Sequence, residues 1–167
     1  MINAIKYRRS HRDFLDQRVN EEKIKAMLDS ALASPSANAK YPWELIVVKD
    51  PSNKKLLAKT TPWSTFAENA DFIIAIIGDE KESPYWIEDC SIVAEHLWLE
   101  ATEQNLGACW IQIRNQRQAE DIVKEVLNIP DHLRVLCLLA IGLPANKLPE
   151  HQVKDFDRKK IKYEKYK

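Results

Sequence analysis

The residues best suited to chemistry lie close to the N-terminus, in the stretch 7–14, which reads Tyr-Arg-Arg-Ser-His-Arg-Asp-Phe. Within it, three arginines and one serine fall inside five residues: Arg8, Arg9, Ser10 and Arg12. Arginine presents a planar set of donors that matches phosphate, and a serine hydroxyl adds a short neutral donor. The cluster therefore indicates a site for phosphate or another oxyanion. Arginine clusters more often lie on a solvated surface, so the rest of the chain has to decide between the two readings.

Other kinds of site have little support in the sequence. Only three glycines occur, at 78, 107 and 142, which excludes glycine-rich phosphate loops and leaves side chains to bind any phosphate. The histidines and cysteines are scattered, so we expect no metal site. No serine stands in a Gly-x-Ser-x-Gly turn, and no acid–base pair can be singled out. This pattern favours a bound cofactor that carries its own chemistry.

Alternating and helical apolar periodicities predict the elements that must position this cluster. We expect helices at 20–33, 50–59, 86–104 and 119–127, and strands at 44–48, 72–77, 108–113 and 134–141. Asn20 and Asp50 are typical N-caps, and Pro51 suits the first position of a helix. Helices that separate strands indicate an α+β or α/β sandwich around a small sheet, and the sequence pattern leaves the strand pairing open.

The longest predicted helix, 86–104, carries a wide apolar stripe and is expected in the core or at a subunit interface. Its acidic residues are expected mostly on a solvated side: Glu88, Asp89, Glu95 and Glu100. Four tryptophans could line a planar ligand, although tryptophans more often belong to the core: Trp63, Trp86, Trp98 and Trp110.

Composition points to one soluble domain followed by a different kind of segment. Lys plus Arg equal Asp plus Glu at 25 each, so we expect neither a nucleic acid nor a membrane as partner. The three cysteines lie in apolar surroundings, which fits buried free thiols and a cytoplasmic location. Residues 1–142 form the expected domain. Residues 143–167 are polar with little periodicity, and therefore are expected to be a free tail or an arm laid on another surface.

Four segments together resemble the nitroreductase superfamily of FMN-dependent oxidoreductases. Residues 8–14 resemble its opening R-R-S-x-R-x-F, and 33–48 resemble A-P-S-x-x-N-x-Q-P-W-x-F-I-V-V. Residues 106–111 resemble the G-L-G-x-x-W segment, and 158–160 fall where the family has a basic residue before a proline. The chain departs from the pattern at Ala39, Tyr41 and Lys160, where the family has Asn, Gln and Pro.

The resemblance implies an α+β fold with a central, mostly antiparallel sheet flanked by helices, and a homodimer that exchanges its C-terminal arms. Arg8, Arg9 and Ser10 would hold the FMN phosphate and ribityl chain, Arg12 would reach the pyrimidine edge, and Arg158 would close on the phosphate. The partner subunit would line the flavin ring with Pro35, Ser36, Ala37, Asn38 and Ala39. Along the ring near N5 would lie Trp110, Ile111 and Gln112.

The implied activity is ping-pong hydride transfer from NADH or NADPH to FMN, and then to an electron-poor acceptor such as a nitroaromatic compound or quinone. The flavin N5 carries the chemistry, so no catalytic side chain is assigned. Residues 61–66 and 85–86 are the expected mouth of the pocket. Two alternatives are a flavin-dependent dehalogenase or flavin-degrading enzyme on the same fold, and a non-catalytic module that binds flavin or a nucleotide.

Overall fold

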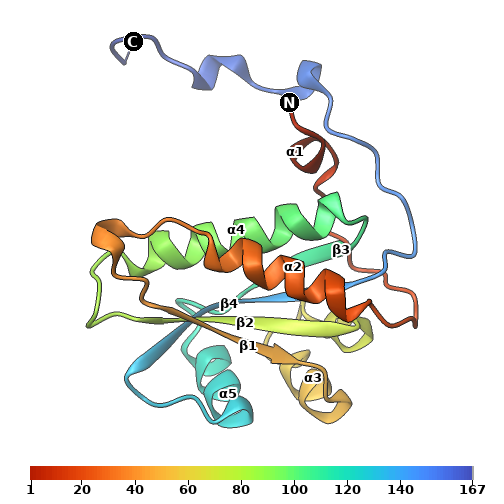
Figure 1. Ribbon diagram of the computed structural model, residues 1–167, viewed down its shortest axis with the longest axis vertical. Helices are drawn as coiled ribbons and strands as arrows, with labels where there is room; N and C mark the ends of the chain where they lie inside the picture. The colour runs from red at the N-terminus through yellow and green to blue at the C-terminus, as the bar shows by residue number, and fades with distance from the viewer. Residues whose placement is uncertain (167) are drawn as a thin grey trace.

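The computed structural model describes residues 1–166 and is built around a four-stranded sheet (Figure 1). The strand order is β1-β2-β4-β3, and each neighbouring pair is antiparallel. The strands are β1 (Trp43–Val48), β2 (Phe72–Asp79), β3 (Gly107–Gln112) and β4 (Leu133–Gly142). The expected sandwich around a mostly antiparallel sheet is therefore confirmed.

Helices cover both faces of the sheet. One face carries α2 (Glu21–Leu32) and α4 (Trp86–Glu103), and the other carries α3 (Pro51–Leu57) and α5 (Arg117–Leu127) (Figure 1). A short α1 (Asn3–Tyr7) lies over α4, and 3-10 turns occur at Ala37–Ala39, Thr65–Asn69, Val153–Asp155 and Arg158–Lys160. Among residues 1–166, no helix is both long enough and apolar enough to cross a membrane.

Strand β2 separates two hydrophobic cores. Its side chains alternate: Ile74 and Ile76 pack under α2 and α4, whereas Ile73 and Ile77 pack toward α3 and α5. Every residue from Phe72 to Gly78 is buried, as expected of a strand that is covered on both faces. The long helix α4 buries its apolar stripe in the first core, so its predicted central position is confirmed.

Local capping signals set most of the helix ends. The Asn20 side chain accepts a hydrogen bond from Glu22 N at 2.7 Å, and that of Asp50 accepts one from Asn53 N at 2.8 Å. Helix α4 ends where Asn105 takes up a left-handed conformation with φ 61°, and Leu106 N then donates to Ala101 O at 2.7 Å. The predicted caps are confirmed, although α3 ends at Leu57 rather than at 59.

The arginine cluster is attached to the edge of the sheet beside β3. Ser10 forms a parallel bridge with Ala108, and His11 N donates to Ala108 O at 3.0 Å. Gly107 permits this close approach, because a Cβ added there would lie 2.8 Å from the His11 Cβ. The segment after α1 is thus held in register against the strand that carries Trp110.

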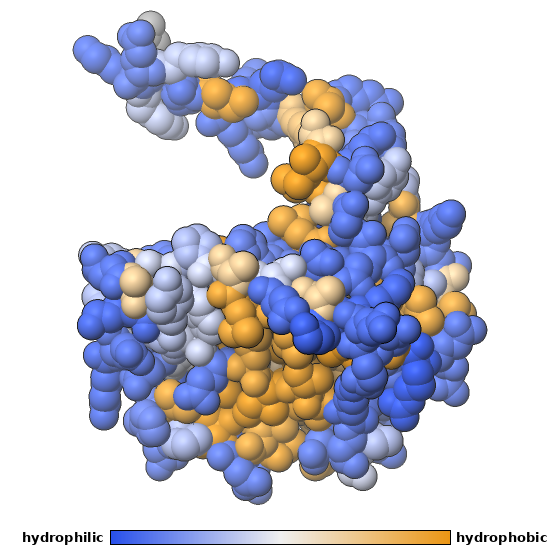
Figure 2. Space-filling model, viewed as in Figure 1, coloured by the Kyte–Doolittle hydropathy of each residue, from blue (hydrophilic) through white to orange (hydrophobic). Residues whose placement is uncertain are grey.

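The C-terminal segment follows the body only as far as His151. Leu15 N donates to Leu143 O at 2.8 Å, and His151 N donates to Lys6 O at 2.9 Å. Beyond this point an arm, residues 152–166, runs away from the body past α1 (Figure 1), and open space separates the two (Figure 2). Apolar side chains remain exposed along it: Val153, Phe156, Ile161, Tyr163 and Tyr166.

A buried ion pair ties α5 to the sheet and leads to a stability prediction. Glu120 is 7% exposed, accepts hydrogen bonds from Arg134 Nε and Nη2 at 2.8 and 2.9 Å, and accepts another from Val135 N at 3.0 Å. We expect Glu120→Gln to lower the free energy of unfolding by about 2 kcal/mol at pH 7, because Arg134 loses its buried charged partner but keeps the more exposed Glu80 at 3.0 Å. Urea unfolding, with the exposed neighbour Asp121→Asn as control, measures this.

The same measurement has an expected pH dependence. Burial alone would raise the pKa of Glu120, but the hydrogen bonds from Arg134 and Val135 outweigh it and hold the pKa below its usual 4.5. The contribution of the Glu120 carboxylate to the free energy of unfolding is therefore fully present above about pH 4.5 and is lost as the pH falls through the pKa of Glu120 in the folded state. The stability gap between wild type and Glu120→Gln should narrow in acid, and an unchanged gap would contradict this assignment.

Candidate cofactor-binding site

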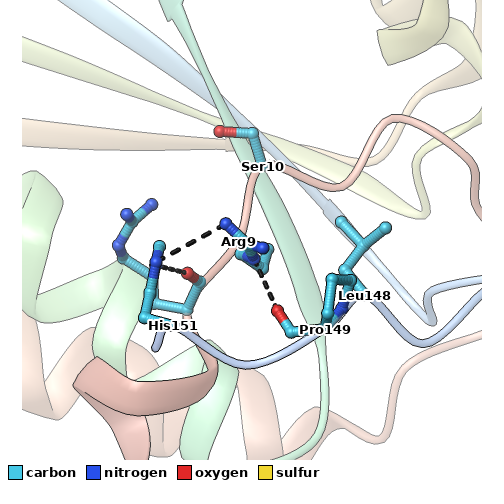
Figure 3. A pocket seen from close by; sticks show the side chains of 6 residues that line it. Arg9, Ser10, Leu148, Pro149 and His151 are labelled. Carbon is cyan, nitrogen blue, oxygen red and sulfur yellow. Dashed lines mark hydrogen bonds between the residues drawn. The ribbon is translucent and has the colours of Figure 1, made fainter. Parts of the chain in front are cut away.

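Arg8, Arg9 and Ser10 line a pocket of about 270 Å³ at the start of the C-terminal segment (Figure 3). The other lining residues are Leu148, Pro149 and His151. Arg9 Nε donates to Pro149 O at 2.7 Å, so the C-terminal segment fixes the direction of this guanidinium. The structure thus brings three of the predicted phosphate ligands together.

His151 also lines this pocket, although no feature of the sequence pattern distinguishes it. Its Nε2 lies 2.8 Å from Arg8 O, and its Nδ1 lies 3.5 Å from Arg9 Nη1 (Figure 3). A carbonyl can only accept, so Nε2 carries a proton in this contact, and Nδ1 can accept from Arg9 as a neutral ring nitrogen. The imidazole therefore links the backbone of one arginine to the side chain of the next.

The three arginines of the cluster have no carboxylate partner among the described residues, so they can bind an anion. None of Arg8, Arg9 and Arg12 forms an ion pair with a carboxylate in the part of the chain described. Arg8 instead stacks 4.6 Å above the ring of the buried Trp98. An aromatic face orients a guanidinium without occupying the donors at its edge, so Arg8 can still bind an oxyanion.

A second hollow of about 210 Å³ continues the first along the chain. It is lined by Ser10, His11, Arg12, Asp13, Asn146 and Leu148, and it shares Ser10 and Leu148 with the first pocket. The guanidinium of Arg12 lies 5.8 Å from the ring of Phe66. Burial, and then the charge of Arg9, lower the pKa of His11, which keeps this imidazole neutral at pH 7.

Strand β3 presents its predicted site residues on two faces. Trp110 Nε1 donates to Gln112 Oε1 at 2.9 Å, so these two side chains lie on the same face of the strand. The side chain of Ile111 points the opposite way and is buried in the second core. A ring beside β3 could therefore contact Trp110 and Gln112 through side chains, but Ile111 only through its backbone.

The thiol of Cys109 lies close behind this surface. Burial raises its pKa, while the charge of Arg12 and a hydrogen bond from Ser10 act in the opposite direction. The net effect is a raised pKa, so the thiol stays protonated at neutral pH and is a poor nucleophile. Burial likewise raises the pKa of Cys90 to about 12. All three cysteines are free and buried, as the sequence predicted.

Loop 34–41 is attached to the first turn of α4, whereas Arg8 contacts Trp98 in the second half of this helix. Ala37 N and Ser36 Oγ donate to the carboxylate of Asp89 at 3.0 and 2.9 Å. Asp89 is only 3% exposed, so it is an exception to the expectation that the acids of this helix face solvent. The sequence signal was weak because Glu88 and Asp89 are adjacent, and only the second of them points inward.

The predicted site residues fall into two groups that contact different turns of α4. Loop 34–41 is tied to Asp89 in the first turn of α4, whereas Arg8 stacks on Trp98, nine residues or roughly 14 Å further along that helix. Arg158 lies in the arm and does not line the arginine pocket (Figure 1). Among the side chains that the structure describes, which exclude that of residue 155, no three of His, Cys, Asp or Glu come together as metal ligands.

Comparison with known proteins gives consistent matches. The sequence model of the Nitroreductase family matches residues 5–143. A structure of an FMN-dependent nitroreductase from Clostridium difficile R20291 has 35% identity and a TM-score of 0.96, covering 99% of this chain and 100% of that one. A Methanothermobacter thermautotrophicus protein, provisionally named NADH dehydrogenase/NAD(P)H nitroreductase, is 30% identical over 95% of this chain and 84% of its own. An FMN reductase (NADPH) of Bacillus subtilis is 29% identical over 87% and 66%.

Proposed function

Because this chain belongs to the nitroreductase family and is an NAD(P)H oxidoreductase, we propose that it works with bound FMN on an electron-poor acceptor such as a nitroaromatic compound or quinone. The observation that carries the proposal is the pocket formed by Arg8, Arg9 and Ser10, in which neither arginine forms an ion pair with a carboxylate of the described chain. Dianionic phosphate requires such multidentate cationic donors. Free cysteines in the core support a reducing, cytoplasmic setting.

The residues present fit FMN by their chemistry. Arg8 and Arg9 would bind the phosphate, with Ser10 as a neutral donor, and Arg12 in the adjoining hollow would bind the polar edge of the ring. Trp110 offers a partly exposed aromatic surface on β3. The chemistry that FMN supplies when bound is two-electron transfer from NAD(P)H to the acceptor in two half-reactions. The protein orients and encloses it, and the buried, protonated Cys109 takes no part.

We also propose that the active form is a homodimer in which each subunit supplies loop 34–41 to the other subunit's flavin. This accounts for the separation of the two groups of site residues along α4. It also gives the arm, residues 152–166, a surface on which its exposed apolar side chains could be buried. Residues 1–142 would then be the catalytic domain and 143–167 the exchanged segment.

The free edge of the sheet is a suitable place for the partner's arm. Ser10 covers part of the β3 edge, but β1 at the other edge pairs only with β2 among the described residues. Leu45, Ile46 and Val47 on β1 are only partly buried, and Figure 2 shows a broad hydrophobic area where β1 crosses this face. An uncovered apolar edge strand invites pairing with another chain.

The visible absorption spectrum tests the proposed function. We expect the purified protein to retain FMN after incubation and desalting, and the flavin bands to bleach when NADH or NADPH is added without oxygen. Retained flavin that does not bleach would favour a non-catalytic flavin-binding module. Bleaching with no reoxidation by nitroaromatics or quinones would favour the dehalogenase or flavin-degrading alternative. Failure to retain FMN would contradict the proposal.

A further inference from the structure

We propose that Asp89 is the positioning residue of the loop that lines the flavin: its carboxylate fixes the backbone of residues 36–41. The inference rests on the proposed function, because contact between this loop and the flavin is part of that proposal. The anchoring itself, however, is a property of one chain and is visible in its contacts. No catalytic role is assigned to Asp89, since it acts through the loop.

Asp89 is hydrogen-bonded directly to the start of the turn and reaches its end only through Ser36. Oδ1 accepts from Ala37 N at 3.0 Å, and Oδ2 accepts from Ser36 Oγ at 2.9 Å. The same Ser36 Oγ accepts from Tyr41 N at 2.8 Å. One serine hydroxyl therefore connects the carboxylate on α4 to the far end of the loop, and residues 37–40 are held between these two points.

The turn needs such an anchor because its backbone is unfavourable for its residues. Asn38, Ala39 and Tyr41 have φ angles of 54°, 53° and 49°, all in the left-handed region. Asparagine tolerates this region, but alanine and tyrosine adopt it only when surrounding contacts impose it. Two of the three residues at which the chain departs from the family pattern, Ala39 and Tyr41, thus depend on the anchor.

A second contact between this loop and α4 should confine the loosening that follows loss of the Asp89 carboxylate to residues 36–41. Ser34 Oγ lies 2.9 Å from His96 Nδ1, and His96 stands two helical turns after Asp89. The beginning of the loop therefore has its own attachment. Loss of the Asp89 contacts should loosen residues 36–41 while 30–34 stay protected.

Loss of the Asp89 contacts would also free Tyr41, whose aromatic ring is exposed. Tyr41 is 54% exposed, and its ring meets that of Trp43 edge-on with a centroid distance of 5.4 Å. Because Tyr41 N is the last link from Asp89, the carboxylate also sets where this ring stands beside the cofactor. Its removal should therefore weaken flavin binding and raise the KM for aromatic acceptors more than it lowers kcat.

Amide hydrogen exchange of the cofactor-free protein tests the anchoring directly. We expect Asp89→Ala to speed exchange in residues 36–41 by about tenfold, because both hydrogen bonds to the carboxylate are lost. Asp89→Asn can still accept from Ala37 N and should lie between wild type and Asp89→Ala. Ser36→Ala should release Tyr41 while keeping the Ala37 contact. The matched control is Glu88→Ala, an exposed acid on the same turn, which should change nothing.

FMN titration of the same variants then tests the link to the cofactor. Affinity should fall in the order wild type, Asp89→Asn, Asp89→Ala, with Glu88→Ala equal to wild type. Unchanged loop exchange in Asp89→Ala, or faster exchange spread over the whole chain in both Asp89→Ala and Ser36→Ala, would overturn the anchoring. A wild-type protein that binds no FMN would overturn the proposed function and, with it, the flavin part of this inference. The two failures therefore appear in different measurements.

Discussion

Arg9→Ala is expected to raise the dissociation constant for FMN by about 100-fold or more, as measured by fluorescence titration. The guanidinium lies in the arginine pocket, directed by its hydrogen bond to Pro149 O, and has no carboxylate partner among the described residues. Truncation of a charged donor that binds phosphate typically costs 2–5 kcal/mol, roughly 30- to several thousand-fold in affinity. The substitution also removes the contact with His151, which should add to the loss.

Comparison of FMN with riboflavin makes this prediction specific for phosphate. If Arg9 binds the phosphate, wild type should bind FMN much more tightly than riboflavin, and Arg9→Ala should lose most of that preference. Arg9→Lys keeps the charge but not the forked geometry, so it should fall between the two. Arg117→Ala, at the exposed start of α5, is the matched control and should bind like wild type. An Arg9→Ala protein that keeps the full preference for FMN would exclude Arg9 from the phosphate site.

Much of the fold could be predicted because its signals are local. Asn20, Asp50 and Asn105 satisfy or reverse the backbone beside them, so their effect is visible in a few residues of sequence. The continuous apolar run 72–77 likewise indicates a strand that is buried on both faces. Strand order depends on contacts between distant segments and was not predicted, and the mostly antiparallel direction came only from the resemblance to a family.

In the candidate site, too, features with a local sequence signal were predicted, and features that depend on distant contacts were not. Arginine type and spacing pointed to the pocket at Arg8 and Arg9, since charge density is a property of sequence. The role of Asp89 depends on its contact with a loop more than fifty residues earlier in the chain. The role of His151 depends on its contact with the residues that follow α1. An acid on a helix and a histidine in a polar segment have no local feature that distinguishes them from solvated residues. Arg158 was chosen by family position and lies in the exposed arm, as that choice implied; its contact with the phosphate stays a prediction.

If the proposed homodimer forms, deletion of residues 153–167 is expected to convert it into a monomer and to abolish retention of FMN. Without a partner, the arm leaves Phe156, Ile161 and Tyr163 exposed, and the β1 edge stays uncovered. Burial of such side chains in both subunits would supply much of the dimer's stability. Light scattering after size exclusion should give about twice the 19.4 kDa chain mass for wild type and the single-chain mass for the deletion.

A single substitution distinguishes a buried arm from a merely tethered one. Ile161→Asp removes apolar area and places a charge in the proposed contact, whereas Lys165→Asp makes an even larger change in charge four residues later, on a side chain that is exposed. Burial of one isoleucine contributes about 1.5–3 kcal/mol, and the dimer contains two copies, so Ile161→Asp should weaken dimerisation by on the order of 100-fold or more. Lys165→Asp should dimerise nearly as wild type does. Equal effects of the two would indicate that the arm acts through its charge, and a wild-type protein of single-chain mass that still retains FMN would show that one chain completes the site without its partner.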